Sequence, residues 1–274
     1  YNSIINKLSS IFSFFSFFAL RASEGRKYFF ALIREKQKIL YKHVLRLDKD
    51  LLEISDSTFG DPIGFYENEK FYTSLFLKNL IKINCIKRNI DFNSIENIVE
   101  LGAGTGLLAS CFLKLKKNVK YLIVDIPPTL FISEYYLKNL GFKVFGYEEL
   151  KKNNYGNLNE VFKDFQVCCL PTWRLDFIKD SKFDLFLNIA SFQEMEKEQS
   201  LNYIKFFCEK IKGYIYLENS IEGHHKTSKE GSFGVLNPTT KKDLEKEILD
   251  LFSIKFSEIE GEKYISIYEK KLII

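Results

Sequence analysis

The chain has 274 residues, 46% of them hydrophobic, and its 27 Phe and 15 Tyr supply much of the apolar material. This is enough for one sizeable α/β domain with an additional helical segment. The net charge of +4 comes from scattered lysines rather than from a basic block, which argues against a nucleic-acid partner. Five cysteines without C-x-x-C spacing and only three histidines argue against a zinc site and indicate buried thiols in a reducing compartment.

Residues 1–55 are predicted to form a helical N-terminal extension, with a charged, periodic stretch from Glu35 to Leu52. Within it, residues 11–20 read I-F-S-F-F-S-F-F-A-L, and basic residues follow. Ten such residues are too few to span a bilayer as a helix. Two interpretations stay open. The segment packs on the rest of the protein or on a partner in a homo-oligomer, or it is an interfacial helix that contacts a membrane surface.

Residues 56–97 are predicted to hold a loop and a helix. The stretch Asp56–Glu69 is punctuated by Gly, Pro and Asn, which is typical of a loop, and a helix is expected from Phe71 to Ile90. The loop residues Gly60–Asn68 are a candidate lid over an acceptor. A simple connector between two helices fits the same residues.

Residues 98–274 show a regular alternation of strand and helix patterns, which predicts a parallel sheet with helices on both faces. Expected strands are Ile98–Leu101, Tyr121–Asp125, Lys143–Phe145, Phe183–Ile189 and Tyr214–Glu218. Two late apolar segments, Phe252–Ile259 and Tyr264–Tyr268, flank a hairpin-type turn. The expected fold is therefore α/β: a Rossmann-like, seven-stranded, mostly parallel sheet with a C-terminal antiparallel hairpin.

A glycine-rich turn is the most informative feature of this region. Val99–Ala109 reads V-E-L-G-A-G-T-G-L-L-A, which predicts a strand, a turn and a helix, and the next strand ends on Asp125. Glycines let the backbone approach a nucleoside closely, and an acid at the end of the next strand can accept hydrogen bonds from a ribose diol. Dinucleotides and S-adenosylmethionine are both bound by this geometry.

The spacing of the glycines separates these two ligand classes. A dinucleotide fingerprint reads G-x-G-x-x-G and places a helix N-terminus against a pyrophosphate. Here the pattern is G-x-G-x-G, and Glu100 precedes it. A carboxylate at this place would repel a pyrophosphate but suits the cationic methionine end of S-adenosylmethionine. The pattern E-L-G-x-G-x-G strongly resembles that of the class I methyltransferases, in which a hairpin also ends the sheet.

Further blocks resemble a bacterial family of sugar O-methyltransferases over roughly residues 56–220. Residues 125–137 match D-x-P-x-T-L-x-x-x-E-Y-Y-L at every fixed position, and residues 183–195 are similar to F-D-L-x-I-N-x-x-S-x-x-E-M. Residues 170–173 read L-P-T-W where the family has L-P-P-W, and Asp61 replaces the Asn of a G-N-P-x-G block. The glycine loop, G-A-G-T-G at residues 102–106, differs from that family's G-G-G-Y-G and matches the general pattern of the superfamily.

The resemblance implies an S-adenosylmethionine donor, with S-adenosylhomocysteine as product, and a set of residues that hold it. The glycines would line the methionine and ribose, Asp125 would bind the ribose hydroxyls, and Ser191 would lie near the sulfonium. A lone tryptophan such as Trp173 is more often a core residue, which is the competing interpretation. The donor-binding candidates are Glu100, Gly102, Ala103, Gly104, Gly106, Asp125, Ile126, Thr172, Trp173 and Asn188.

The catalytic candidates follow the late strands of the sheet, at the edge where ligands bind in open α/β folds. A sugar hydroxyl is a poor acid, so a general base, or a divalent metal that acidifies the hydroxyl, is expected. His224 and His225 are the candidate bases, with His225 slightly favoured, and Glu194 would position the substrate. Solvated loop histidines and a helix-capping carboxylate are the competing interpretations. Glu218 and Asn219 have no metal-ligand spacing, so no metal residues are assigned.

The favoured function is methyl transfer to the hydroxyl of a sugar, nucleotide sugar or glycan in polysaccharide or glycoconjugate assembly. The expected location is the cytoplasm, with the inner face of the membrane as an alternative if residues 11–20 contact lipid. Methyl transfer to another small molecule, a lipid or a protein is a second hypothesis. A non-catalytic module that binds S-adenosylmethionine is a third, and a dinucleotide oxidoreductase is a distant fourth.

Overall fold

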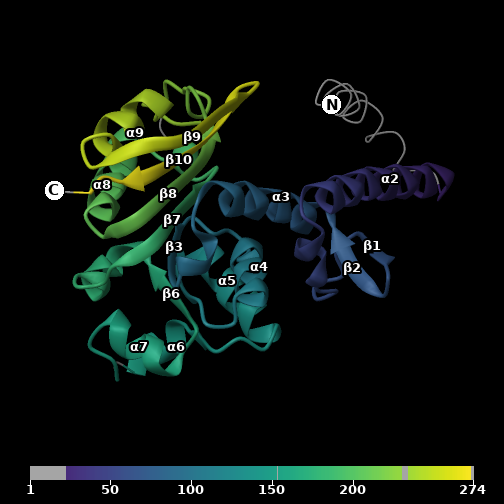
Figure 1. Ribbon diagram of the computed structural model, residues 1–274, viewed down its shortest axis with the longest axis horizontal. Helices are drawn as coiled ribbons and strands as arrows, with labels where there is room; N and C mark the ends of the chain where they lie inside the picture. Colours follow the sequence, from purple (N-terminus) through teal and green to yellow (C-terminus); the bar gives the residue numbers. More distant parts are fainter. Residues whose placement is uncertain (1–22, 153, 230–233, 273–274) are drawn as a thin grey trace. The chain divides into compact units, whose positions relative to one another are not determined.

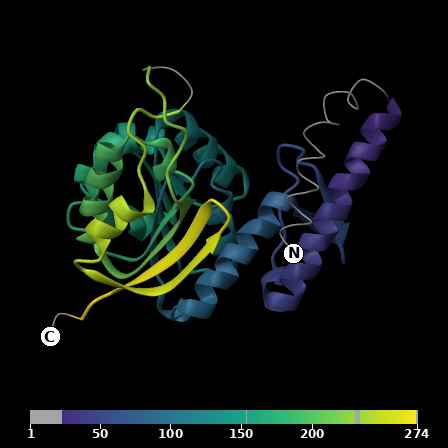
Figure 2. The ribbon, with the colours of Figure 1, turned by 90° about the horizontal axis from the view of Figure 1, so that it is seen from above.

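The computed structural model describes residues 23–152, 154–229 and 234–272, with the side chains of residues 23–28 left out. The aromatic segment at residues 11–20, and the two interpretations of it, lie outside the described residues. The chain divides into two compact units, the first ending at Ile81 and the second running from Lys82. Figures 1 and 2 show the ribbon from two directions.

The first unit combines a long helix with a small hairpin. Helix α2 (Ser23–Leu47) and a short 3-10 helix (Lys49–Glu53) precede the antiparallel strands β1 (Gly64–Glu67) and β2 (Lys70–Thr73). The loop expected over residues 56–69 is thus wrong in its second half, and helix α3 begins at Ser74 rather than at Phe71. Asn68 and Glu69 have φ of 49° and 62°, which lets two residues reverse the chain between short strands.

The second unit is built on an eight-stranded sheet. Its strands lie in the order β5 (Val144–Phe145), β6 (Val167–Pro171), β4 (Lys120–Asp125), β3 (Asn97–Leu101), β7 (Phe183–Ile189), β8 (Ile211–Ser220), β10 (Lys263–Lys270), β9 (Phe252–Glu260). The strands from β5 to β8 are parallel, and β10 is antiparallel to both β8 and β9. The mostly parallel Rossmann-like sheet with an antiparallel C-terminal hairpin is confirmed. It has one strand more than expected, because β6 was not among the seven expected strands, whereas β5 corresponds to the strand expected over Lys143–Phe145.

Helices cover both faces of this sheet (Figures 1 and 2). One face packs against α7 (Leu158–Asp164), α8 (Lys197–Cys208) and α9 (Lys241–Ile248), in a core rich in phenylalanine. The other carries α4 (Leu107–Leu115), α5 (Pro127–Asn139) and the later part of α3 (Ser74–Asn89). Burial on both faces explains why the central strands read as nearly continuous apolar runs. It also brings the carboxyl ends of β3, β4, β6, β7 and β8 to one edge.

Candidate functional site

The glycine loop joins β3 to α4, and its glycines adopt a backbone conformation that other residues rarely reach. Gly102, Gly104 and Gly106 have φ of 79°, 58° and 75°. A Cβ on Gly102 would lie 2.1 Å from Oγ of Ser191, so the loop depends on glycine there to let the end of β7 approach. A Cβ on Gly104 would meet nothing within 4 Å. The backbone of Gly104 is therefore open to a ligand.

Asp125 ends β4 beside this loop and is 8% exposed. Its Oδ2 accepts a hydrogen bond of 3.1 Å from the backbone N–H of Gly104. Its Oδ1 accepts from the N–H of Ile126 at 2.7 Å and from the hydroxyl of Thr129 at 2.6 Å. The acid is thus fixed against the glycine loop on one side and against the first turn of α5 on the other.

Glu100 lies on β3 just before the loop and is only 3% exposed. Its Oε2 accepts a hydrogen bond of 2.7 Å from the hydroxyl of Tyr121 on the neighbouring strand β4. Burial raises the pKa of Glu100 to about 7, partly offset by the bond from Tyr121, and the charge of Asp125 raises it further. Its carboxyl group therefore titrates near neutral pH beside the loop.

Two exposed apolar side chains follow neighbouring strands at the same edge. Ile126 follows β4 and is 55% exposed, while Trp173 follows β6 and is 66% exposed. The strands that precede them end side by side, because Asp125 and Pro171 are partners in the β4–β6 register. Trp173 is therefore not a core residue, and the interpretation of a lone tryptophan as part of the core is wrong here. An apolar surface of this kind, with Thr172 beside it, suits the face of a nucleobase.

Asn188 near the end of β7 is fully buried and is tied to its surroundings by four hydrogen bonds. Its Nδ2 donates to the carbonyl of Leu101 at 3.0 Å, and its Oδ1 accepts from the N–H of Phe192 and from Nδ2 of Asn219. A fourth bond runs from Nδ2 of Asn219 to the carbonyl of Asn188. Asn188 thus fastens the ends of β3, β7 and β8 to one another. Its described contacts are structural, and the contact with the donor expected for it stays a prediction.

The turn that follows β7 carries the acceptor-side candidates. Ala190 has a φ of 54°, uncommon for a residue other than glycine, and strain of this kind concentrates at functional sites. Ser191 follows and packs on Gly102, and a short 3-10 helix (Phe192–Glu194) comes next. Glu194 is thereby placed at the carboxyl edge of the sheet, three residues beyond the contact with the glycine loop.

The structure brings Glu194 and His224 together, with Oε2 of Glu194 at 3.6 Å from Nε2 of His224. Their side chains are 53% and 24% exposed. His225 is exposed, and its carbonyl accepts a hydrogen bond from the N–H of Val235. Of the two adjacent histidines, His224 is therefore the one that faces the carboxylate, although His225 was slightly favoured from the sequence.

Among the described residues of the same edge, Glu218 and Asn219 both have partners within the protein. Glu218 forms an ion pair of 3.2 Å with Lys82 and accepts a hydrogen bond from the hydroxyl of Tyr216. The side chain of Asn219 bonds to Asn188. In the described part of the chain, no group of three or more His, Cys, Asp or Glu side chains could hold a metal ion.

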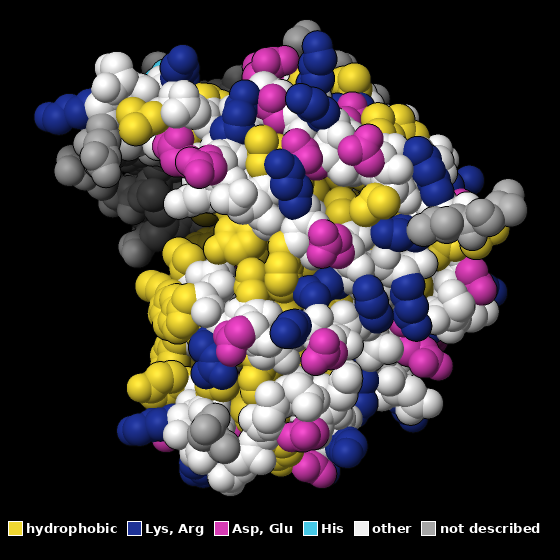
Figure 3. All heavy atoms as spheres, turned by 90° about the vertical axis from the view of Figure 1, so that its left-hand side faces the viewer, with side chains coloured by type: hydrophobic (Ala, Val, Ile, Leu, Met, Phe, Trp, Pro, Cys, Tyr) yellow, Lys and Arg dark blue, Asp and Glu magenta, His cyan; other side chains and the backbone are white. Residues whose placement is uncertain are grey.

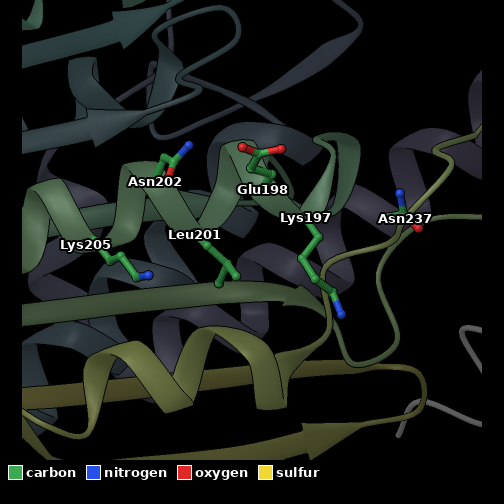
Figure 4. Close-up of a pocket in the computed structure, with 6 residues that line it drawn as sticks. All are labelled: Lys197, Glu198, Leu201, Asn202, Lys205 and Asn237. Atoms are coloured by element: carbon green, nitrogen blue, oxygen red, sulfur yellow. The ribbon is translucent and has the colours of Figure 1, made fainter.

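A groove along α8 is a separate feature (Figure 4). It is lined by Lys197, Glu198, Leu201, Asn202, Lys205 and Asn237. Lys197 and Lys205 reach Asp243 and Glu247 of α9 at 3.0 and 3.5 Å, so acidic partners compensate both cations. On the face drawn in Figure 3, basic side chains likewise lie interspersed with acidic ones. The groove offers no concentrated charge for a ligand.

Sequence reasoning missed several residues that shape the site. Thr129 bonds to Asp125, Tyr121 bonds to Glu100, and the side chain of Gln193 links Ser220 N–H to Glu194 at 2.9 and 3.1 Å. Thr129 carried a usable signal, since it stands four residues after the acid, in the first turn of the following helix. The bond between Tyr121 and Glu100 depends on the β3–β4 register, and the bond between Gln193 and Ser220 joins residues 27 positions apart, so neither had a local signal.

No protein-family model and no curated protein matches the sequence. Among solved structures, the chain is similar to the mitomycin 7-O-methyltransferase MmcR, with 12% identity, 71% of this chain and 57% of that one covered, and a TM-score of 0.46. The N-terminal domain of EvdMO1, solved with SAH and D-fucose, is 12% identical, with 84% of this chain and 96% of that one covered and a TM-score of 0.48. The protein PH0226 of Pyrococcus horikoshii OT3 is 16% identical, with 71% of this chain and 89% of that one covered and a TM-score of 0.49. The chain thus spans a little over half the length of MmcR. Likeness at this level concerns the fold and carries over no activity.

None of the helices in the described part of the chain combines the length and the apolar character that a bilayer crossing requires.

Proposed function

We propose that the chain is an S-adenosylmethionine-dependent methyltransferase that transfers a methyl group to a sugar hydroxyl. The observation that carries this proposal is the carboxylate of Asp125, which is fixed beside the open backbone of Gly104 at the carboxyl edge of the sheet. An acid in this place suits a ribose diol, and the buried Glu100 before the loop disfavours a pyrophosphate.

The described residues fit such a donor at three points. Asp125 would accept a hydrogen bond from a ribose hydroxyl, Ile126 and Trp173 would contact the adenine, and the glycine loop would contact the methionine part. When bound, the donor supplies an electrophilic methyl group on a sulfonium. The protein's contribution is to hold and orient both reactants, which supplies much of the rate in a displacement of this kind.

On the acceptor side, the Glu194–His224 pair supports a role in proton removal. The hydroxyl oxygen of the acceptor would form the new bond to the methyl carbon, the electrons of the broken carbon–sulfur bond would stay on sulfur, and the imidazole of His224 would take the hydroxyl proton. A carboxylate at 3.6 Å stabilises the imidazolium that results. His225 would then be dispensable for this step.

The sugar acceptor rests on the sequence resemblance over residues 56–220. A nucleotide sugar or glycan acceptor in polysaccharide or glycoconjugate assembly, in the cytoplasm or at the inner face of the membrane, is part of the same proposal. The proposal also includes a homo-oligomer and membrane contact through residues 11–20.

Product mass analysis with nucleotide sugars, small aromatics, lipids and peptides as acceptors tests the assignment of a sugar acceptor. Methylation of a non-sugar acceptor alone would refute the sugar assignment and leave the methyltransferase assignment standing.

Calorimetric titration tests the donor assignment. S-adenosylmethionine and S-adenosylhomocysteine are expected to bind and NAD is not. Asp125→Ala should weaken binding of both, whereas Asp180→Ala, at an exposed acid in the turn before β7, is a matched control that should bind them normally. Binding of NAD in preference to S-adenosylmethionine would refute the proposal.

A further inference from the structure

The carboxylate of Asp125 is held by three donors with unequal roles. Oδ1 accepts two hydrogen bonds, from Ile126 N–H and from the Thr129 hydroxyl, whereas Oδ2 accepts one, from Gly104 N–H. A carboxylate offers about four acceptor positions, two on each oxygen. The described contacts therefore fill Oδ1 and leave one position on Oδ2, the oxygen on the side of the glycine loop.

Thr129 occupies the first turn of α5, and its hydroxyl is well placed for this contact. It lies 2.6 Å from Oδ1 of Asp125 and 3.0 Å from the carbonyl oxygen of Ile126. A hydroxyl carries one proton, so it can donate to only one of these acceptors at a time. The shorter contact, to an ionised acceptor, is the stronger of the two.

We infer that Thr129 is a positioning residue of the donor site, which fixes the Asp125 carboxylate so that Oδ2 faces a ribose hydroxyl. This inference rests on the proposed function. Without the Thr129 hydroxyl, Oδ1 would keep only the Ile126 N–H, so a single hydrogen bond would oppose rotation of the carboxylate from the helix side. Thr129 itself would not contact the ligand.

The competing role is purely structural. A threonine in the first turn of a helix commonly bonds to nearby backbone, and such a residue would stabilise α5 without affecting ribose recognition. The two roles differ in which ligands would bind more weakly after the hydroxyl is removed. A positioning residue affects ligands that carry ribose hydroxyls, whereas a structural residue affects every ligand of the site.

The test is a comparison of two ligands on three proteins by calorimetry. S-adenosylhomocysteine and its 2′,3′-dideoxy analogue are titrated into the wild type, Thr129→Val and Thr129→Ser. For S-adenosylhomocysteine, Thr129→Val should lower the affinity roughly tenfold, as expected for one hydrogen bond to a charged group, and Thr129→Ser should restore it. For the dideoxy analogue, the wild type and Thr129→Val should agree within about twofold. Thermal unfolding confirms that the variants are folded.

Each remaining outcome counts against a defined part of this account. An equal loss for both ligands in Thr129→Val would assign Thr129 a structural role and overturn the inference alone. Unchanged affinity for both ligands would do the same. If the wild type fails to bind S-adenosylhomocysteine, the proposed function fails and the inference falls with it.

Discussion

The proposed donor side of the site, formed by the glycine loop and Asp125, is built differently from the proposed acceptor side, formed by Glu194 and His224. The donor side consists of backbone groups and one nearly buried carboxylate at the ends of buried strands. The acceptor side consists of side chains that are 53% and 24% exposed, carried by a short 3-10 helix and a loop. Rigid strand ends suit the binding of a constant ligand, and loops suit an acceptor that differs between enzymes.

The largest effect is expected on the acceptor side, where chemistry should depend on one histidine of the two. With an acceptor that gives turnover in the wild type, His224→Ala should lower kcat by about 10²–10⁴-fold, the usual contribution of a general base. His225→Ala should change it less than about threefold. Formation of S-adenosylhomocysteine measures both, and calorimetry checks that donor binding is retained. A large loss in His225→Ala with none in His224→Ala would reverse the assignment.

On the donor side, Gly102→Ala should be strongly destabilising. The alanine would have to adopt a φ of 79°, and its Cβ would lie 2.1 Å from Oγ of Ser191. Backbone strain and overpacking together should lower the unfolding free energy by about 3–4 kcal/mol. Gly141→Ala is the matched control, because Gly141 has a φ of 85° and open space around it. It should lose only about 1 kcal/mol. Urea unfolding of the two variants compares them, and equal losses would show that the contact with Ser191 is unimportant.

Glu100 should make the stability of the protein depend on pH. Its pKa is raised from 4.5 to about 7, so between these values the folded state binds more protons than the unfolded state. The contribution of the Glu100 carboxyl group to the unfolding free energy is therefore highest below pH 4.5, falls as the pH rises, and levels off above pH 7. From pH 5 to pH 8, Glu100→Gln should gain roughly 2–3 kcal/mol of unfolding free energy relative to the wild type.

Urea unfolding at both pH values measures this difference, and Glu258→Gln, at an exposed carboxylate, is the control whose difference from the wild type should stay flat. If the Glu100→Gln difference also stays flat, the carboxyl group of Glu100 is ionised at pH 5 in the folded protein.

The smallest effect is expected at Trp173. Because this side chain is 66% exposed, Trp173→Ala should change the unfolding free energy by less than about 0.5 kcal/mol. The affinity of the Trp173→Ala variant for S-adenosylhomocysteine should fall about tenfold, as expected for loss of stacking on a base. Tyr147→Ala removes an aromatic side chain of similar exposure on α6 (Tyr147–Lys152) and should bind normally. Unchanged affinity in Trp173→Ala would place the adenine elsewhere.

The sequence predicted the two sides unequally, for physical reasons. Strands β3, β4 and β7 were placed to within one residue, because strands buried on both faces read as apolar runs with clear ends. The glycine loop and Asp125 have fixed spacing from those ends. The hairpin of β1 and β2 was missed, because each strand has only four residues and the turn lacks glycine.

The acceptor side had no such signal. His224 and His225 are neighbours in a loop, and only the three-dimensional approach of Glu194 distinguishes them. The same applies to Glu100, whose bond to Tyr121 depends on the β3–β4 register rather than on local sequence.

A crystal structure with S-adenosylhomocysteine would show directly whether Asp125 binds the ribose of the donor. We expect a ribose hydroxyl within hydrogen-bond distance of Asp125, the adenine against Ile126 and Trp173, and the sulfur on the side of Glu194 and His224. A ligand bound away from the glycine loop, or with its ribose turned away from Asp125, would refute the proposed donor site.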